Sequence, residues 1–263
     1  MDIIYQDSYI LAVNKPAGII IHSDGTSHAG ERAGMCAAET LTDLARVYLE
    51  NNGCVQQAQD VQALHRLDKD TTGIVLFSLD KETQPLFDEL IRSRNVHKTY
   101  LAVVKGEFPE GEQDITLPIG RDRHDARRMR VSKTGKAALT HVRRLEVQRR
   151  GQSTQSLMLA ELGTGRKHQI RVHLSSINRH ILGDHLYGFK SENAKISRIL
   201  LHAYLLYFIH PRSGKEVKIC AGLPSEFLNF TTNQKVKDEI YEKILPTNVE
   251  RYFSDTSGWL RYV

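Results

Sequence analysis

Residues 65–77 read HRLDKDTTGIVLF, a charged stretch that runs directly into four apolar residues. The apolar run predicts a short buried strand over residues 74–78. Asp68 stands between Arg66 and Lys69 just before this strand. An aspartate in this place is often only a turn or capping residue, but one held among cations beside a rigid strand also serves as an ionised nucleophile. The other motifs of the chain distinguish these two interpretations.

The composition is typical of a soluble globular protein. The chain has 263 residues, of which 40% are hydrophobic and 25% charged, enough for one large domain or two small ones. It has no run of 18 apolar residues and no secretory signal at its start, so we expect a cytoplasmic protein without a membrane span. Cys36, Cys54 and Cys220 are scattered, which argues against a disulfide framework and a cysteine-type zinc site.

The charge favours a polyanionic partner. The net charge is +5 and the sequence pI is about 9.0. Basic residues concentrate in three segments, which are residues 121–130 with five arginines, 143–150 and 166–171. Each segment also fits a solvated loop or face, and we favour that interpretation for Arg149 and Arg150, which flank a predicted turn at Gly151. For residues 121–130 we favour RNA contact over a mobile loop.

Local patterns predict single helices interspersed with hairpins. We expect strands over residues 3–5, 10–14, 74–78 and 97–104, and hairpins over 140–148 with 156–162 and 205–209 with 216–220. We expect helices over residues 41–51, 81–94, 168–177 and 236–245, the first two capped by Thr40 and Asp80, and a loop over residues 22–39. This order of elements predicts an α+β fold with a largely antiparallel mixed sheet and flanking helices.

Several familiar catalytic motifs are absent from the sequence. The 12 histidines include no His-Glu-x-x-His pair, and His168 and His173 are five residues apart, so they do not share a helical face. The glycine-containing segments at residues 133–136 and 163–167 lack the spacing of a phosphate-binding loop, and there is no Gly-x-Ser-x-Gly elbow. We therefore expect neither a metal nor a nucleotide cofactor.

A set of motifs in a fixed order carries the strongest signal. They are Asn14-Lys15-Pro16-Ala17-Gly18 with His22, the segment 65–73, His97-Lys98-Thr99-Tyr100, Gly163–His173, Ile181-Leu182-Gly183-Asp184 with Tyr187-Gly188, Leu201-His202-Ala203 and His210-Pro211. Together they strongly resemble the RluA-type family of pseudouridine synthases over about residues 1–230. The resemblance implies a catalytic domain with a central cleft over residues 1–230, followed by a partly helical C-terminal extension over residues 231–263.

The resemblance also implies a reaction and its catalytic residues. The family isomerises uridine in RNA: the N-glycosidic bond breaks, the uracil rotates, and a bond forms from C5 to the sugar, without a metal or external cofactor. Asp68 matches the catalytic aspartate, Tyr100 the tyrosine that lies against the base, and Arg171 the arginine that pairs with the catalytic carboxylate. Arg66 matches a residue that fills the gap left by the flipped nucleotide, and Leu201 an apolar residue of the base pocket.

This chemistry agrees with the residues themselves. A stacked uridine must be extruded before its sugar or ring can react, and extrusion requires cations that hold the phosphates. A guanidinium next to a carboxylate favours its ionised form and offsets its desolvation. Whether Asp68 attacks C1′ or acts as a base that forms a glycal stays open.

Two positions depart from the family pattern, since Thr72 replaces the usual serine and Lys167 a threonine or serine. We also find no N-terminal S4-type domain, so RNA recognition is expected on the catalytic domain itself. Its candidate RNA-binding residues are His65, Arg66, Arg121, Arg123, Arg127, Arg128, Arg166, Lys167 and His168.

Two other functions are compatible with the sequence. A non-catalytic RNA-binding or RNA-folding protein on the same scaffold requires only the basic segments. A hydrolase that uses Asp68 with His65 is disfavoured, because no partner that orients the histidine and no oxyanion site is evident. The sequence leaves ribosomal and transfer RNA both open as substrates. We expect a monomer with no obligate protein partner.

Overall fold

The computed structural model describes residues 1–22, 39–151, 153–189, 196–254 and 260–262. The expected loop over residues 22–39 lies outside these ranges except at its two ends. The chain divides into two compact units, one formed by residues 1–96 and 207–221 and the other by residues 97–206 and 222–263. Among the described residues, no helix has both the length and the apolar composition that crossing a membrane requires.

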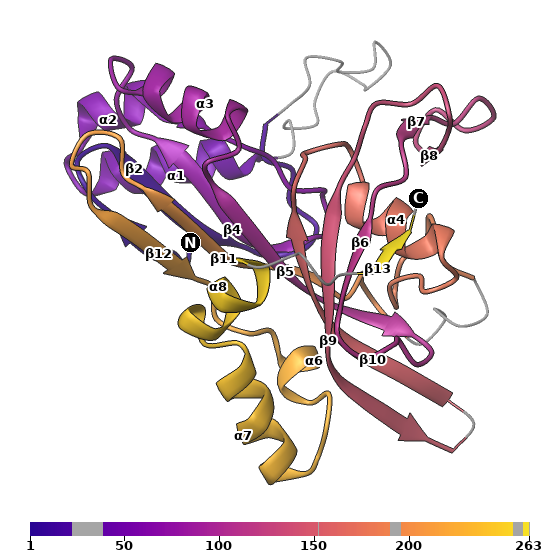
Figure 1. Cartoon of the computed structure of the whole chain (residues 1–263). Helices are drawn as coiled ribbons and strands as arrows, with labels where there is room; N and C mark the ends of the chain where they lie inside the picture. The colour runs from indigo at the N-terminus through magenta and orange to yellow at the C-terminus, as the bar shows by residue number, and fades with distance from the viewer. Residues whose placement is uncertain (23–38, 152, 190–195, 255–259, 263) are drawn as a thin grey trace, which may run out of the picture. The chain divides into compact units, whose positions relative to one another are not determined.

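The first unit is built around one fully buried strand. This strand is β4 (Thr72–Ser78), and it pairs antiparallel with β2 (Ile10–Lys15) and with the short β3 (Gln62–Ala63). β1 (Ile3–Gln6) pairs antiparallel with β2. The unit also contains the helices α1 (Leu41–Asn51), α2 (Val55–Asp60) and α3 (Gln84–Arg92) and the strand β12 (Glu216–Cys220) (Figure 1).

The ends of the helices follow from local hydrogen bonds. At α1, the Thr40 side chain accepts the N–H of Asp43, and the Asp43 carboxylate accepts the N–H of Thr40, which confirms the predicted cap. The predicted start of α3 was wrong by three residues. Asp80 instead accepts the N–H groups of Glu82 and Thr83 in a turn that precedes the helix, so the helix begins at Gln84.

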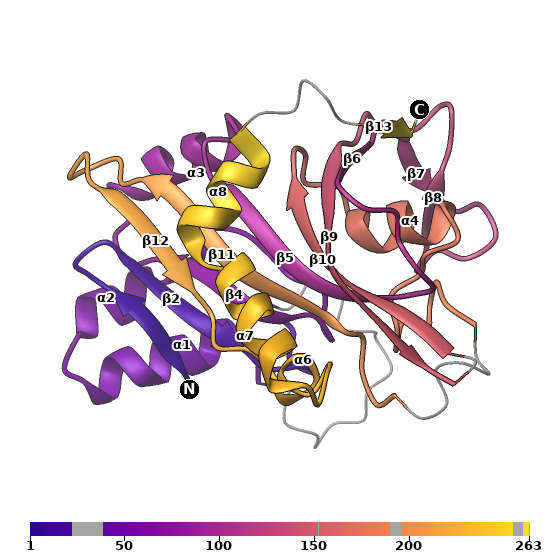
Figure 2. The same cartoon turned by 60° about the horizontal axis from the view of Figure 1, so that its bottom comes forward.

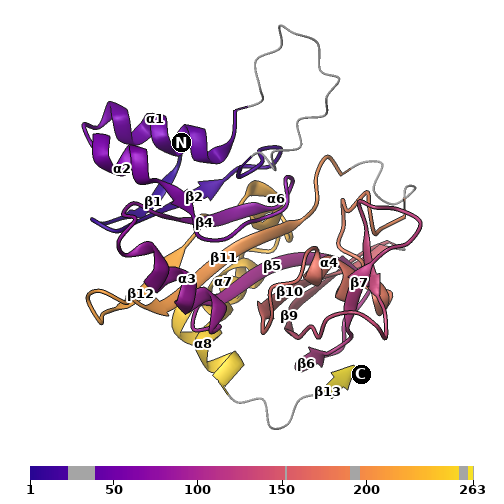
Figure 3. The same ribbon diagram turned by 90° about the horizontal axis from the view of Figure 1, so that it is seen from above.

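A mostly antiparallel sheet forms the second unit. Its strands lie in the order β11-β5-β10-β9-β6-β13. The β5–β10, β10–β9 and β9–β6 pairs are antiparallel, and the β6–β13 pair is parallel. The strands are β5 (His97–Lys105), β6 (Glu112–Ile115), β9 (Thr140–Arg150), β10 (Ser153–Leu162), β11 (Leu201–Ile209, whose last three residues belong to the first unit) and β13 (Leu260–Tyr262). Figure 3 shows β13 beside β6. The hairpin predicted around Gly151 is confirmed.

Different helices cover the two faces of this sheet. Tyr100, Ala160 and Val142 are cross-strand neighbours and share one face. Thr140, two residues before Val142, lies on the same face, and its hydroxyl contacts side chains of α4 (Gln169–Ser176). We conclude that α4 covers the face that carries Tyr100.

The opposite face is covered by the C-terminal helices α6 (Ser225–Leu228), α7 (Gln234–Lys243) and α8 (Pro246–Ser254), which follow one another in Figure 2. The guanidinium of Arg143 lies 3.9 Å from the ring centroid of Tyr252 in α8. Tyr204 donates its hydroxyl to the carbonyl of Ile244, and Lys243 donates to the carbonyl of Leu145. The C-terminal segment therefore supports the sheet from the side that faces away from α4.

A separate β-hairpin packs on α4. The strands β7 (Ile119–Arg121) and β8 (Met129–Val131) pair antiparallel (Figure 1). Residues 122–128 connect them as the loop expected in the arginine-rich segment, whereas the two flanking strands were not predicted. Its apolar residues belong to a cluster that includes Val172 of α4 and comprises Ile119, Met129, Val131, Ala138, Val172 and Tyr187. The hairpin is thus anchored by its apolar side chains.

Gly135 closes the turn that follows β8. Ile119 and Lys136 exchange two main-chain hydrogen bonds of 2.9 Å, so the chain returns along β7. A Cβ at residue 135 would lie 2.5 Å from the carbonyl carbon of Ile119. Only glycine allows this approach without a shift of β7.

Candidate active site

Asp68 lies in the first unit, in the turn that leads into β4. The carbonyl of Asp68 accepts the N–H of Thr71, and the Asp68 side chain is half-buried. Leu67 is 7% exposed and anchors the segment in the core, while the neighbouring Arg66 is exposed. Because Leu67 is buried and Arg66 is exposed, Asp68 lies at the boundary between core and solvent. A carboxylate in this place is held by the core and still accessible to a ligand.

Lys15 fixes the main chain around Asp68. Its side chain is 0% exposed, and its Nζ donates to the carbonyl oxygens of Lys69 at 2.6 Å and Pro16 at 2.8 Å. Burial lowers the pKa of Lys15 to about 8, while the charges of Asp70 and Asp68 act in the opposite direction. The segment that carries Asp68 is therefore tied to the end of β2 by a buried ammonium. Lys15 belongs to the motif Asn14–Gly18, but the sequence does not indicate that it contacts the segment of Asp68.

His65 has a structural contact in the same segment. Its Nε2 accepts the N–H of Leu76 at 3.1 Å, which places the proton of the neutral imidazole on Nδ1. Nε2 is therefore engaged with β4. This contact argues against the hydrolase interpretation, in which His65 would activate a nucleophile.

In the second unit, the Gly163–His173 motif surrounds the start of α4. Gln169 is the centre of this arrangement: its amide nitrogen donates to the Leu139 carbonyl and the Thr140 hydroxyl, and its oxygen accepts from Thr164 Oγ1 and the N–H of Arg166. Gln169 is 3% exposed. A buried and satisfied network of this kind fixes one orientation of the helix.

His173 is the second anchor of α4. Its Nδ1 lies 2.9 Å from the Thr140 hydroxyl and its Nε2 lies 2.8 Å from the Leu117 carbonyl. Because a carbonyl only accepts, Nε2 carries the proton and Nδ1 accepts from Thr140. Burial lowers the pKa of His173 to about 4, so the ring is neutral at neutral pH. His173 is therefore a structural residue that holds α4 against Thr140 and Leu117.

Arg171 pairs with Asp184, a carboxylate that the sequence analysis did not assign to it. Its Nε and Nη2 donate to the two oxygens of Asp184 at 2.8 and 2.9 Å, a bidentate arrangement. Asp184 is 0% exposed at its side chain and also accepts the N–H groups of Leu186 and Tyr187. Removal of either side chain would take a bidentate, charge-assisted contact from the other, which is costly for a buried charge.

The position of Asp184 depends on the residue before it. Gly183 has a φ of +76°, and a Cβ there would lie 1.9 Å from the carbonyl oxygen of Arg198. The segment is joined to β5 by a bridge between Ile181 and Val104 and by a hydrogen bond from Leu182 to Val103. The main chain two residues before Gly183 thus lies along β5, the strand that carries Tyr100, and Gly183 permits the turn that leads to Asp184.

Tyr100 and Leu201 are core residues of the second unit. Tyr100 on β5 is 6% exposed and Leu201 on β11 is 4% exposed. The expected catalytic and pocket residues Tyr100, Arg171 and Leu201 therefore all belong to this unit, whereas Asp68 belongs to the first.

The expected RNA-binding residues of the second unit differ in their surroundings. Arg121, Arg123 and Arg127 are exposed, and Arg127 pairs with Asp125 in its own loop. Arg166 donates its Nε to the Ala137 carbonyl, whereas Lys167 is exposed. In addition, Nδ1 of His168 lies 2.8 Å from the Tyr187 hydroxyl, and Arg128 lies over the Tyr187 ring.

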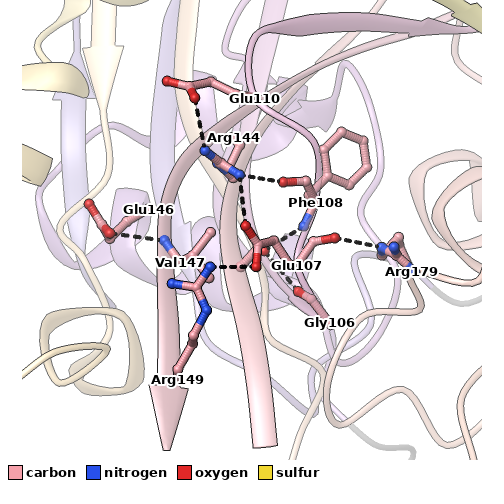
Figure 4. Close-up of polar contacts among 10 residues, drawn as sticks. Gly106, Glu107, Phe108, Glu110, Arg144, Glu146, Val147, Arg149 and Arg179 are labelled. Atoms are coloured by element: carbon pink, nitrogen blue, oxygen red, sulfur yellow. Dashed lines mark hydrogen bonds and ion pairs between the residues drawn. The ribbon is translucent and has the colours of Figure 1, made fainter.

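The basic segment around residues 143–150 is paired with carboxylates (Figure 4). Arg144 lies between Glu107 and Glu110 and donates to the Phe108 carbonyl. Arg149 pairs with Glu107 at 2.5 Å, and Arg143 pairs with Glu112. Arg149 is exposed, as expected, and its guanidinium forms a surface ion pair with Glu107. The Arg150 side chain lies outside the described residues.

No group of histidine, cysteine or carboxylate side chains in the described part of the chain has the arrangement of a metal site.

Comparison with known proteins agrees with the motifs. Residues 9–176 match the RNA pseudouridylate synthase family. The chain is 33% identical to RNA pseudouridine synthase YhcT of Bacillus subtilis, over 87% of this chain and 70% of that protein. It is 34% identical to ribosomal large subunit pseudouridine synthase D of Xylella fastidiosa, covering 86% and 67%, and 33% identical to tRNA pseudouridine synthase C of Haemophilus ducreyi, covering 86% and 93%.

Solved structures confirm the predicted α+β fold. Human RNA pseudouridylate synthase domain containing 1 matches with a TM-score of 0.68 and 26% identity, covering 85% of this chain and 83% of the human chain. Human RNA pseudouridylate synthase domain containing 4 matches with a TM-score of 0.66 and 24% identity, covering 91% and 93%. The chain belongs to the RluA-type family of RNA pseudouridine synthases and is an intramolecular isomerase.

Proposed function

We propose that this enzyme converts a uridine of ribosomal or transfer RNA to pseudouridine, with Asp68, Tyr100 and Arg171 as its catalytic residues. Relatives of similar identity are named for each kind of RNA, which supports the class of substrate. The observation that carries the assignment of Asp68 is its half-buried carboxylate on a turn that the buried Lys15 ammonium holds in place. The family match includes all three residues.

In this proposal each residue has a separate task. The Asp68 carboxylate cleaves the glycosidic bond, either by attack on C1′ or as the base that forms a glycal. Arg171 favours the ionised carboxylate, and Asp184 keeps the guanidinium oriented. Tyr100 lies against the base and removes the proton from C5 after the new bond has formed, and Leu201 packs near the uracil.

RNA binding is assigned mainly to the β7–β8 hairpin. Its segment 121–130 contains five arginines and two aspartates, and several of the arginines are exposed. Guanidinium groups on this surface bind phosphates and contribute to the cost of extruding the uridine. Arg66 and His65 of the first unit contact the flipped nucleotide and its neighbours, and Arg166, Lys167 and His168 add contacts beside α4. Residues 1–230 carry these functions, and residues 231–263 support the sheet.

The decisive experiment replaces Asp68 by asparagine. We expect Asp68→Asn to lose pseudouridine formation by at least about 1000-fold, because an amide neither attacks C1′ nor accepts a proton as a carboxylate does. Its RNA affinity and unfolding midpoint should change little. Asp70→Asn is the matched control, since Asp70 is an exposed carboxylate of the same turn and should retain activity.

The substrate is identified by mapping pseudouridine in total RNA from cells with and without the gene, and the variants are then assayed on an unmodified transcript that contains the mapped site. Full activity of Asp68→Asn would contradict the catalytic assignment. A wild-type protein that binds RNA but forms no pseudouridine would support the non-catalytic RNA-binding function instead.

A further inference from the structure

Tyr187 connects the β7–β8 hairpin to the start of α4. Its hydroxyl accepts the N–H of Met129, the first residue of β8, at 2.8 Å. The same oxygen lies 2.8 Å from Nδ1 of His168, the residue that precedes α4. Its ring also belongs to the apolar cluster between the hairpin and Val172 of α4. A single side chain therefore contacts both elements through polar and apolar groups.

The ring of Tyr187 also lies near two guanidinium groups. The guanidinium carbon of Arg128 is 5.2 Å from the ring centroid, and that of Arg171 is 5.0 Å from it. Both distances are within the range of cation–π attraction. The main-chain N–H of Tyr187 donates to Asp184, the carboxylate that binds Arg171. Tyr187 is therefore linked to Arg171 through its ring and through a shared carboxylate.

Two further observations indicate that this link is under constraint. His168 has a φ of +56°, which costs a non-glycine residue on the order of 1 kcal/mol and persists only where surrounding contacts hold it. The Nε of Arg128 is buried and has no hydrogen-bond acceptor among the described residues. A phosphate or ribose oxygen of bound RNA would contact the other N–H groups of the half-buried Arg128 guanidinium while its ring contact with Tyr187 is kept.

We propose that Tyr187 is a positioning residue that links RNA contact at the β7–β8 hairpin to the placement of Arg171; this role rests on the function proposed above. The hydroxyl sets the hairpin through Met129, and the ring together with Asp184 sets the guanidinium of Arg171. RNA that engages Arg128 therefore stabilises the same contacts that orient the catalytic arginine.

The protonation state of Tyr187 agrees with its contacts. Burial raises the pKa of Tyr187 to about 12, so the hydroxyl keeps its proton at neutral pH. Its oxygen accepts the N–H of Met129 and forms a second hydrogen bond with Nδ1 of His168. Replacement by phenylalanine removes both hydrogen bonds but retains the ring, whereas leucine also removes the ring.

The two variants separate the two halves of the role. We expect Tyr187→Phe to raise the KM for RNA about 3- to 10-fold with kcat within twofold of wild type, because the hairpin loses its polar anchor. Tyr187→Leu should in addition lower kcat about 10-fold, because Arg171 loses the ring. Tyr204→Phe is the matched control, since it removes a buried hydroxyl whose bond to the Ile244 carbonyl lies on the opposite face; both constants should stay within twofold.

A double-mutant comparison distinguishes this role from a general loss of stability. In a variant with Arg121, Arg123, Arg127 and Arg128 all changed to glutamine, Tyr187→Phe should alter RNA affinity less than twofold, because the hairpin no longer binds RNA. The same fold-change in both backgrounds, or a wild-type KM for Tyr187→Phe, would overturn the proposal. Affinity is measured on unmodified ribosomal and transfer RNA transcripts and does not require catalysis. The double-mutant comparison therefore tests the link to the hairpin even if the wild-type protein forms no pseudouridine. That last result would refute only the proposed function.

Discussion

The β7–β8 hairpin and the β9–β10 hairpin are both rich in arginine, but their guanidinium groups have different partners. On β9, Arg144 and Arg149 contact the carboxylate of Glu107 (Figure 4). On the β7–β8 hairpin, Arg121 and Arg123 are exposed, and neither lies within 4.0 Å of a carboxylate in the described part of the chain. Arg127 of the β7–β8 hairpin pairs with Asp125 of its own loop, so the contrast between the two segments rests on Arg121 and Arg123.

The difference shows what local charge density leaves out. Glu107 precedes Arg149 by 42 residues, so the neutralising carboxylate is not visible near the arginine in the sequence. An exposed and unpaired guanidinium keeps its field for a polyanion, whereas a paired one has to break an existing contact first. Of the two regions, the β7–β8 hairpin is therefore the better candidate for RNA contact.

Neutralising each region in turn should give the largest effect. We expect the change of Arg121, Arg123, Arg127 and Arg128 to glutamine to weaken RNA binding about 100- to 1000-fold at low salt, because up to four phosphate contacts are lost. The slope of log affinity against log salt should become shallower by about 3. Both are measured by titrating a labelled unmodified transcript at several salt concentrations.

The matched control changes Arg143, Arg144 and Arg149 to glutamine. RNA affinity should stay within about threefold of wild type, while urea unfolding should show a slightly lower free energy of unfolding, because the partly buried Glu112 and the Phe108 carbonyl lose their guanidinium partners. Equal losses of affinity in the two variants would remove the distinction between the regions.

Acid should loosen the support of the β7–β8 hairpin. Burial lowers the pKa of His173 from 6.5 to about 4, so between these pH values the unfolded chain binds a proton that the folded chain excludes. The free energy of unfolding should therefore fall as the pH is lowered from 6.5 to 4, by about 2–3 kcal/mol from this residue. His202, whose burial lowers its pKa to about 4, acts in the same direction.

Urea unfolding at several pH values tests this expectation. His173→Gln keeps a donor and an acceptor but does not titrate, so it should remove part of the acid slope. Hydrogen-exchange protection should decrease in β7 and β8 before it decreases at the β9–β10 tip. An unchanged slope in the variant would exclude His173 as its source.

Two glycine substitutions should give the smallest effect. Gly135→Ala should destabilise the fold by about 1–2 kcal/mol and lower RNA affinity severalfold, because a Cβ there collides with the main chain of Ile119 in β7. Gly151→Asn at the β9–β10 turn should cost less than about 1 kcal/mol and leave affinity unchanged, since its φ of +57° suits asparagine and nothing lies within 4 Å. Thermal unfolding and RNA titration of both variants provide the measurement, and an equal loss of affinity would contradict the anchoring of β7 by this turn.

The sequence predicted the elements whose apolar residues repeat regularly. Both the buried β4 and the amphipathic α1 were found with their approximate bounds. By contrast, α2 buries only Ala58, and β6 buries Gln113 and Asp114, so neither has an apolar pattern to detect. β7 and β8 were missed for a related reason, because each strand has only three residues and few apolar side chains, which pack in a cluster with Val172 of α4.

At the site, the sequence identified side chains but not their partners. Asp68 and Arg171 were predicted from motifs, yet the contact of Arg171 with Asp184 depends on a turn at Gly183 that spacing alone does not reveal. Tyr187 belongs to one of the motifs, but no role was predicted for it, because its contacts come from β8 and from the residue before α4. The type of each residue indicates which chemistry its side chain can perform, whereas the contacts that orient the side chain depend on residues that only the fold brings together.

The buried Lys15 affects how alkaline kinetics should be interpreted. Its ammonium loses its proton near pH 8 and holds the carbonyl of Lys69, next to Asp68. Above that pH the reaction rate is therefore expected to fall because the main chain that carries Asp68 loses its contact with the Lys15 ammonium. No group that touches uridine has to titrate for this fall to occur. An alkaline limb in a rate profile would thus be a poor guide to the pKa of Tyr100 in this enzyme.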